Sequence, residues 1–115
     1  MEKIELSAVF PSIAAADLAE FKEVAAAALE LTIPEPGALQ YDWYFSEDET
    51  RCEVRETYAD SDALLAHIAN AGETVGRLIE LGGGFEISIF GRPSAELSEA
   101  MAASNPTVYG YFQGK

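Results

Sequence analysis

The sequence predicts an α+β domain, and three observations support this. Apolar and polar residues alternate in several short segments, apolar residues recur at helical spacing in longer ones, and the two kinds of segment succeed each other along the chain. Proline and glycine stand at the junctions. We expect one domain over residues 1–115, with a core over about 1–92 and a C-terminal extension over 93–115, because 115 residues are enough for a single hydrophobic core.

The first two elements are a strand and a helix. Residues 3–10 alternate in polarity as a strand does, and Pro11 ends it. Residues 14–30 are rich in alanine and carry their larger apolar residues on one helical face, which predicts a helix with Ser12 as its N-cap. The Pro-Glu-Pro-Gly run at 34–37 then ends the helix.

A hairpin and a second helical region follow. Strands are expected over about 40–46 and 51–58, joined by a polar turn. Asp60 or Ser61 then caps a helix, which Gly72 is expected to interrupt. A second helical piece over about 73–81 ends at the three glycines 82–84.

The last elements complete the topology. Residues 85–89 alternate as a strand, Pro93 and Ser94 open a short helix to about 103, and a short fifth strand covers 107–113. The order strand, helix, strand, strand, helix, strand predicts a ferredoxin-like split βαβ fold, an antiparallel sheet with its helices on one face.

The strand alternation divides the side chains between the two faces of this sheet. The face toward the helices is expected to carry Ile4, Leu6, Val54, Ile87 and Ile89. The far face is expected to carry Glu5, Ser7, Glu53, Arg55, Thr57, Glu86 and Ser88, mixed with Val9 and Phe90. Such a half-polar face is either solvated or covered by a second copy of the chain.

Charge and cysteine content exclude several functions. Twenty acidic residues against seven basic ones give a formal net charge of −13, which disfavours nucleic acid and anionic membrane surfaces as partners. The acid excess is read as an aid to solubility. The one cysteine, Cys52, suits a reducing compartment, and no signal peptide or membrane-spanning run is seen, so a cytoplasmic location is expected.

One stretch resembles a known family. The run from Glu53 to Ile68, Glu-Val-Arg-Glu-Thr-Tyr-Ala-Asp-Ser-Asp-Ala-Leu-Leu-Ala-His-Ile, looks like the middle of the antibiotic-biosynthesis-monooxygenase family, in which a strand with a glutamate leads through an acidic turn to a helix with a histidine. The resemblance covers about residues 1–92 in element order. It implies a homodimer with a dimeric α+β barrel, a small pocket between helices and sheet, and in some members oxidation of quinols or anthrone-like aromatics without metal or flavin.

Haem-degrading relatives are a poorer match. They combine an asparagine in the first strand with a tryptophan about ten residues before the helix histidine. Here the first strand has no asparagine and the corresponding position is Thr57. The C-terminal extension also goes beyond the minimal domain, and it could lengthen the sheet, cover the pocket or cross to a partner subunit.

A cofactor-independent oxygenase needs a base, an aromatic pocket and hydrogen-bond donors for an anion. His67, the only histidine, is the candidate catalytic base. The candidate substrate-binding residues are Tyr41, Trp43, Tyr44 and Tyr58 as ring partners and Arg55 as the group that steadies negative charge. No cofactor is expected, and the small aromatic ligand would be held by these side chains alone.

Each assignment has a structural alternative. His67 could be hydrogen-bonded within the core, the aromatic residues could be core packing, and Arg55 could form an ion pair on the sheet face. Cys52 reads as a small buried hydrophobe, and Asp60 and Asp62 with His67 are too few and too well explained by helix capping to predict a metal site. Two hypotheses remain: a cofactor-independent monooxygenase acting on a quinol or hydroxylated aromatic, and a non-catalytic dimeric module that binds a small ligand or serves in stress or assembly.

Overall fold

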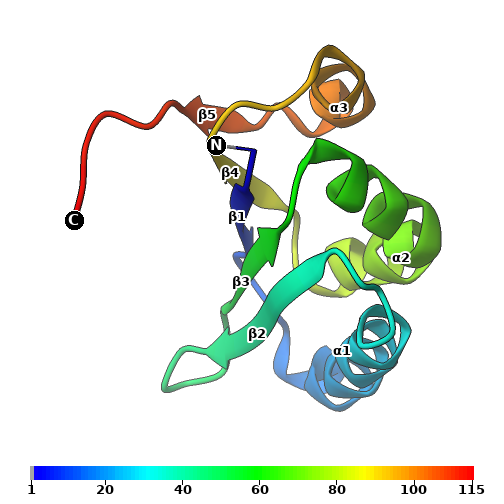
Figure 1. Cartoon of the computed structure of the whole chain (residues 1–115). Coiled ribbons are helices and arrows are strands. Elements are labelled where there is room, and N and C mark those ends of the chain that lie inside the picture. Colours follow the sequence, from blue (N-terminus) through cyan, green and yellow to red (C-terminus); the bar gives the residue numbers. More distant parts are fainter. Residues whose placement is uncertain (1) are drawn as a thin grey trace.

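The computed structural model describes residues 2–115 and confirms the predicted α+β fold (Figure 1). Five strands form one sheet in the order β2-β3-β1-β4-β5, which contains the ferredoxin-like order of the first four strands. The strands are β1 (Ile4–Phe10), β2 (Ala38–Phe45), β3 (Cys52–Tyr58), β4 (Glu86–Phe90) and β5 (Thr107–Tyr109). The helices are α1 (Leu18–Thr32), α2 (Ser61–Leu81) and α3 (Ala95–Met101), with short 3₁₀ turns at Ala15–Asp17 and Ala102–Ser104.

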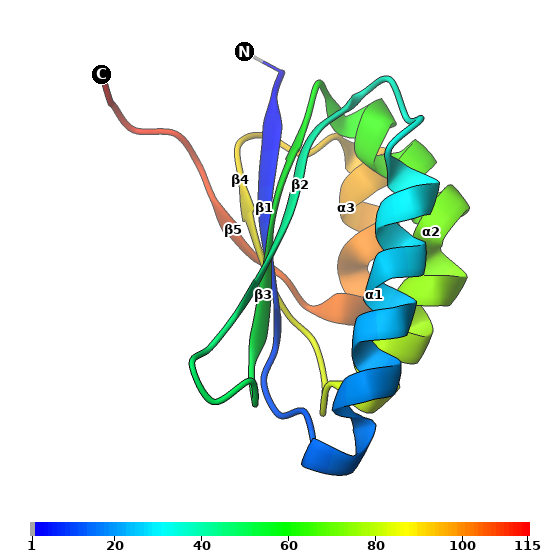
Figure 2. The ribbon, with the colours of Figure 1, turned by 90° about the horizontal axis from the view of Figure 1, so that it is seen from below.

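All three helices cover one face of the sheet, and the other face has no helix over it (Figure 2). The core lies between the two layers. The division of side chains follows the predicted alternation, because inward residues such as Ile4, Val54 and Ile89 are at most 2% exposed, whereas outward ones such as Glu5 and Arg55 are exposed.

Two helix predictions need correction. The first helix begins at Leu18 after a 3₁₀ turn, and Ser12 is not its cap, since the Ser12 amide donates to the Gly82 carbonyl at 2.8 Å. Gly72 does not interrupt α2, which runs unbroken from Ser61 to Leu81. A glycine inside a helix costs only about 1 kcal/mol, and the buried apolar face of this long helix outweighs that cost.

The glycine run after α2 is needed where the chain turns back to the sheet. Gly82 is the C-cap residue, and Gly83 adopts a φ of 73°, which favours glycine. A Cβ atom at Gly83 would lie 2.5 Å from the carbonyl oxygen of Ser12, so the turn packs tightly against the chain that leaves β1. These glycines therefore fix the end of α2 to the end of the central strand.

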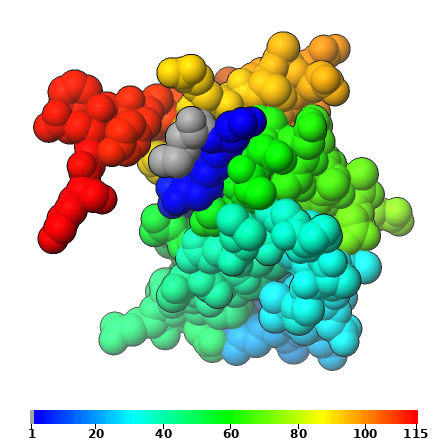
Figure 3. Space-filling model, in the orientation of Figure 1, coloured from blue at the N-terminus to red at the C-terminus, as the bar shows by residue number. Residues whose placement is uncertain are grey.

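The C-terminal extension lengthens the sheet, one of the three options that the sequence left open. Helix α3 lies in the helix layer beside α2. Strand β5 pairs in parallel with β4, so the complete sheet is mixed, and the predicted strand 107–113 ends at Tyr109. Beyond it the chain leaves the body of the molecule (Figure 3), with Tyr111 and Phe112 75% and 87% exposed. No helix among residues 2–115 is long and apolar enough to cross a membrane.

The N-cap of α2 gives a test of the local structure. The Asp60 carboxylate accepts a hydrogen bond from the Ala63 amide at 2.8 Å, whereas Asp17 at the N-cap of α1 makes no such bond. Asp60→Ala is expected to lower the free energy of unfolding by about 1 kcal/mol, and Asp17→Ala by less than about 0.5 kcal/mol. Urea denaturation measures both, and equal losses would contradict the assigned cap.

Candidate functional site

A cavity of about 160 Å³ lies between the sheet and the helices. Its floor is formed by inward residues of β1, β2, β3 and β4, and its roof by α2 and the end of α3. Most of the lining is apolar, with polar groups from a few residues only. The lining residues are Leu6, Ala8, Phe10, Tyr41, Trp43, Val54, Glu56, Leu64, His67, Ile68, Gly72, Val75, Ile79, Phe85, Ile87, Ala100, Met101 and Ser104.

The sheet register arranges this floor in rows. Tyr41, Glu56 and Leu6 are cross-strand neighbours in one row, and Trp43, Val54 and Ala8 form the next. The first row carries a phenol and a carboxyl, whereas the second is apolar apart from the indole nitrogen. The cavity therefore has a polar end at Tyr41 and Glu56, and the remaining floor is apolar.

His67 lies above the polar end and is held by a carboxylate. It is buried on α2, and its Nδ1 lies 3.1 and 3.2 Å from the two carboxylate oxygens of Glu35. Asn70, one turn further along α2, donates to Glu35 at 2.8 Å and to the Leu31 carbonyl at 2.8 Å. With Glu35 ionised, Nδ1 carries the proton that it donates, and Nε2 is left as the basic nitrogen.

Burial lowers the pKa of His67, while the charge and hydrogen bond of Glu35 act in the opposite direction. The imidazole is therefore neutral near pH 7. A neutral histidine that is oriented by a carboxylate has the arrangement of a general base.

Glu35 reaches His67 because the connection between α1 and β2 packs closely on α2. A Cβ atom at Gly37 would lie 2.5 Å from the Ala63 Cβ, so only glycine permits this approach. The Gly37 carbonyl also accepts a hydrogen bond from the Ala59 amide at 2.9 Å. The Pro-Glu-Pro-Gly run that was predicted to end the first helix thus also supplies the carboxylate partner of the histidine.

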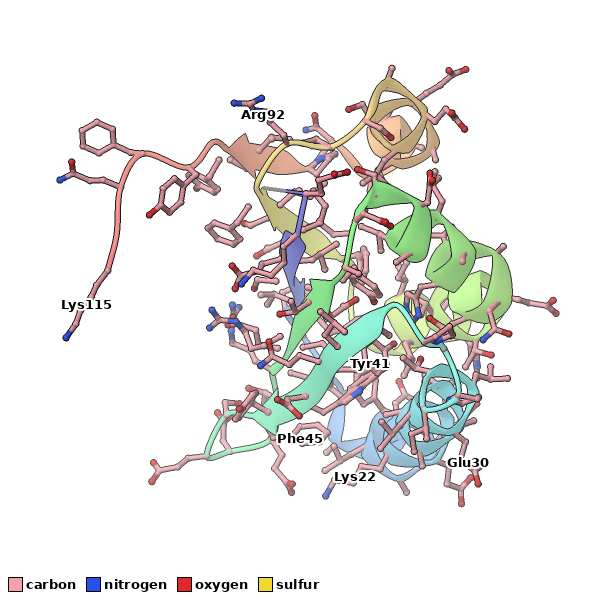
Figure 4. The ribbon with its side chains drawn as sticks, in the orientation of Figure 1. Lys22, Glu30, Tyr41, Phe45, Arg92 and Lys115 are labelled. Carbon is pink, nitrogen blue, oxygen red and sulfur yellow. The ribbon has the colours of Figure 1, made fainter. Side chains whose placement is uncertain are left out.

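Two tyrosine rings pack around the imidazole. The Tyr41 ring centre lies 5.0 Å from that of His67 in an edge-to-face arrangement, and the Tyr58 ring centre lies 5.3 Å away. Burial, with the nearby Glu56 charge, raises the pKa of both phenols above the ordinary value, so both stay protonated. Figure 4 labels Tyr41 on β2, where side chains fill the space between the strand and the helix layer.

Glu56 belongs to the site, although it was not among the residues predicted from the sequence. It is 7% exposed, and the Tyr58 hydroxyl donates to its Oε1 at 2.5 Å. Burial raises the pKa of Glu56 to about 8, the Glu35 charge adds to that rise, and the Tyr58 hydrogen bond opposes it. The signal was in the alternation of β3, because Glu56 shares its parity with the inward-facing Val54 and Tyr58.

The Trp43 indole places a buried N–H donor without a partner on the sheet side of the cavity. Its ring stacks on Phe10 with centres 6.3 Å apart and meets Tyr41 edge to face at 5.4 Å. Within residues 2–115, its Nε1 is the only fully buried side-chain nitrogen or oxygen without a hydrogen-bond partner. Because such donors are normally satisfied, this one is notable beside a cavity.

Tyr44 and Arg55 lie elsewhere. Both point to the far face of the sheet, where Tyr44 is 56% exposed and Arg55 lies 3.6 Å from the Glu53 carboxylate. Neither lines the cavity with His67. They line a broad hollow on the uncovered face together with Lys3, Glu5, Phe90, Arg92 and the C-terminal aromatic residues Tyr109, Tyr111 and Phe112.

The remaining groups do not extend the chemistry. Cys52 is fully buried, and burial raises the pKa of its thiol to about 11, which leaves it unreactive. In the described part of the chain, no three histidine, cysteine or acidic side chains gather as metal ligands would. The candidate site therefore consists of His67, Tyr41, Trp43 and Glu56 on the wall of the cavity. Glu35 and Tyr58 do not line the cavity and act as the hydrogen-bond partners of His67 and Glu56.

The raised pKa of Glu56 has a consequence for stability. The folded state keeps the Glu56 proton up to about pH 8, whereas the unfolded state releases it near the ordinary pKa of 4.5. A rise in pH between these values therefore favours the unfolded state and lowers the stability of the fold. Glu56→Gln is therefore expected to gain stability over the wild type by about 1.4 kcal/mol per pH unit within that interval. Unfolding curves between about pH 5 and pH 8 measure this gain, and a constant difference would contradict a buried neutral carboxyl.

The likeness of this chain to known proteins lies in its structure. No family model matches the sequence, and no curated protein matches it. Among solved structures, MupZ from Pseudomonas fluorescens has a TM-score of 0.80 and 24% identity over 98% of this chain and 92% of its own.

Two further solved structures have the same fold. A mutant of SnoaB, a cofactor-independent oxygenase from Streptomyces nogalater, has a TM-score of 0.67 and 19% identity, covering 83% of this chain and 97% of its own. A candidate antibiotic biosynthesis monooxygenase from Caulobacter crescentus has a TM-score of 0.64 and 28% identity, covering 76% of this chain and 87% of its own. The chain thus has the fold of the antibiotic-biosynthesis-monooxygenase-like proteins, as the resemblance of residues 53–68 indicated.

Proposed function

We propose that the protein is a cofactor-independent monooxygenase that acts, as a homodimer, on a small quinol or other hydroxylated aromatic compound. The observation that carries the proposal is the carboxylate-held His67 at the polar end of an otherwise apolar cavity. The likeness to SnoaB, a cofactor-independent oxygenase, supports the same activity. The buried free thiol of Cys52 suits the reducing cytoplasm.

The cavity volume limits the substrate. An apolar cavity of about 150 Å³ accommodates a benzene ring, so about 160 Å³ suits one substituted ring and not a fused polycycle. Tyr41 and Trp43 supply ring faces and edges against which such a compound packs. A hydroquinone is the simplest compound of this kind that reduces oxygen.

The chemistry begins with proton transfer. Nε2 of His67 takes the proton of a quinol hydroxyl, and Glu35 stabilises the resulting imidazolium through Nδ1. The quinol anion passes one electron to oxygen, and the radical pair combines to form a C–O bond. Loss of the ring proton and cleavage of the O–O bond then give a hydroxyquinone and water, with the proton on His67 passing to the leaving hydroxide. Quinol and one oxygen molecule supply every atom and electron.

Ligand binding without catalysis is the second candidate, and the small, mostly apolar cavity favours it equally well. It predicts that aromatic compounds bind but that no oxygen is consumed. The oxygen-uptake experiment below separates the two functions.

His67→Ala is expected to lower kcat/KM for hydroquinone oxidation by about a hundredfold, since a general base contributes at least that factor. Oxygen uptake by metal-stripped protein measures it, with Glu73→Ala on the exposed side of α2 as the control. Because burial lowers the pKa of His67 below its ordinary value of 6.5, wild-type activity should still be present at pH 6.5 and should fall only at a lower pH. Uptake no faster than autoxidation, or unchanged in His67→Ala, would refute the proposal.

The homodimer is proposed to form through the uncovered face of the sheet. This face carries exposed rings at Tyr44, Phe90 and Tyr109, together with charges of both signs. The C-terminal segment, which ends at Lys115, leaves the body on the same side of the sheet (Figures 2 and 4). A second copy would cover these rings and pair the charges.

Tyr44→Asp is therefore expected to weaken dimerisation at least about tenfold by placing an acid in the interface of an already acidic protein. Sedimentation equilibrium measures the association of the 12.4 kDa chains, with Ala66→Asp on the exposed side of α2 as a control of equal charge. A monomeric wild type, or equal effects of the two variants, would exclude this interface.

A further inference from the structure

The carboxyl group of Glu56 is buried, and the proton transfer proposed for His67 does not use it. Glu56 lines the cavity across from His67, and the hydrogen bond that the structure gives it is on Oε1, from the Tyr58 hydroxyl. No lysine or arginine among residues 2–115 forms an ion pair with it. An ionised Glu56 would be a buried charge without a partner, which is the costly case.

Among the groups around Glu56, the Tyr58 hydroxyl favours the ionised form through the hydrogen bond that it donates, but burial outweighs this contact. On its own strand lies Tyr58, and on β2 its cross-strand neighbour is Tyr41, both protonated phenols. On α2 lies the neutral His67, and the connection between α1 and β2 brings the acidic Glu35. On β1 the neighbour is the apolar Leu6. Near pH 7 Glu56 is thus a carboxylic acid, which donates a hydrogen bond as well as accepting one.

A second donor stands on the same wall. The Trp43 Nε1 is buried without a partner, and the tryptophan occupies the row of the sheet next to that of Glu56. The cavity therefore offers two N–H or O–H donors on its sheet side and a basic nitrogen on its helix side. Two donors opposite a base match a ligand that loses a proton at one position and carries an acceptor oxygen at another.

We propose that the cavity recognises aromatic compounds that carry a carbonyl oxygen, and that the neutral Glu56 donates the hydrogen bond to that oxygen, with Trp43 Nε1 as the second donor. The inference deepens the proposed function, on which it rests for the identity of the site. In the reaction, the negative charge left when His67 removes a proton spreads onto this oxygen, and Glu56 holds it there. Glu56, and not Arg55, thus steadies the negative charge.

Binding of two probes without ionisable groups tests this directly. Acetophenone carries the carbonyl, and α-methylstyrene has nearly the same shape with a methylene group in its place. Trp43 is the only tryptophan of the chain, so quenching of its fluorescence, corrected for absorption by the probes and checked by calorimetry, reports binding in the cavity. Wild type, Glu56→Gln and the far-face control Glu53→Gln are compared at about pH 6.5 and about pH 9.5, on either side of the pKa of Glu56 near 8.

Wild type at the lower pH is expected to bind acetophenone about tenfold more tightly than α-methylstyrene, the factor that one good hydrogen bond gives. At the higher pH the preference should fall below about twofold, because a carboxylate cannot donate. Glu56→Gln should keep the preference at both pH values, since its amide donates without titrating and its oxygen can still accept from Tyr58. Glu53→Gln should behave as wild type.

Three outcomes would overturn the inference: no binding of either probe, equal affinities at the lower pH, or a preference that does not change with pH in wild type. Neither probe reacts with oxygen, so the result does not depend on turnover. A preference that follows this pattern in a protein without oxygen uptake would leave the inference standing and refute only the oxygenase. Oxygen uptake that depends on His67, together with equal binding of the two probes, would support the oxygenase and refute the inference about Glu56.

Discussion

The register of β1 is the constraint on which the rest of the structure depends. This strand pairs with β3 on one side and β4 on the other, over nearly its full length. Its four inward side chains, Ile4, Leu6, Ala8 and Phe10, are at most 4% exposed and form the middle of the core. A shift of one residue would exchange the two faces of the strand, so burial of these side chains fixes the alignment of every row across the sheet.

That alignment decides where the cavity and its polar end lie. Ala8 is small and stands in the centre of the floor, and Gly72 lies above in α2, so neither fills the space between the layers. One row away, the same register places Glu56 between Tyr41 and Leu6. A void and a buried carboxyl both cost stability, and a site for a ligand is a physical reason for a protein to retain them together.

The two faces of the sheet differ in the way each meets its surroundings. On the helix side, polar groups are few and mostly satisfied by one another, as in the contacts of His67 with Glu35 and of Glu56 with Tyr58. On the far side, Arg55 and Glu53 form an exposed ion pair and Ser7 donates to Glu53, contacts that water weakens. The proposed proton transfer therefore belongs to the first face, and the proposed dimer contact to the second.

The sequence by itself determined the order of elements, the strand parity and the N-cap region of α2, because these depend on neighbouring residues. The alternation in residues 52–58 correctly assigned Val54 to the core and Arg55 to the far face. Asp60, one of the two predicted caps, is the N-cap of α2. The prediction placed Tyr41, Trp43 and Tyr44 in one substrate-binding group. Tyr44 has the opposite parity to Tyr41 and Trp43 along the strand, and the alternation of side chains therefore puts it on the other face of the sheet.

Only the tertiary structure decided what depends on contacts between distant segments. The pairing of His67 with Glu35 joins residues 32 positions apart, and it requires the close approach that Gly37 permits. The neutral state of Glu56 depends on burial beneath α2 and on the absence of a cation near it in the described residues, neither of which a local pattern records. The continuity of α2 through Gly72 likewise follows from its packing on the sheet, because tertiary burial outweighs the local preference of one residue.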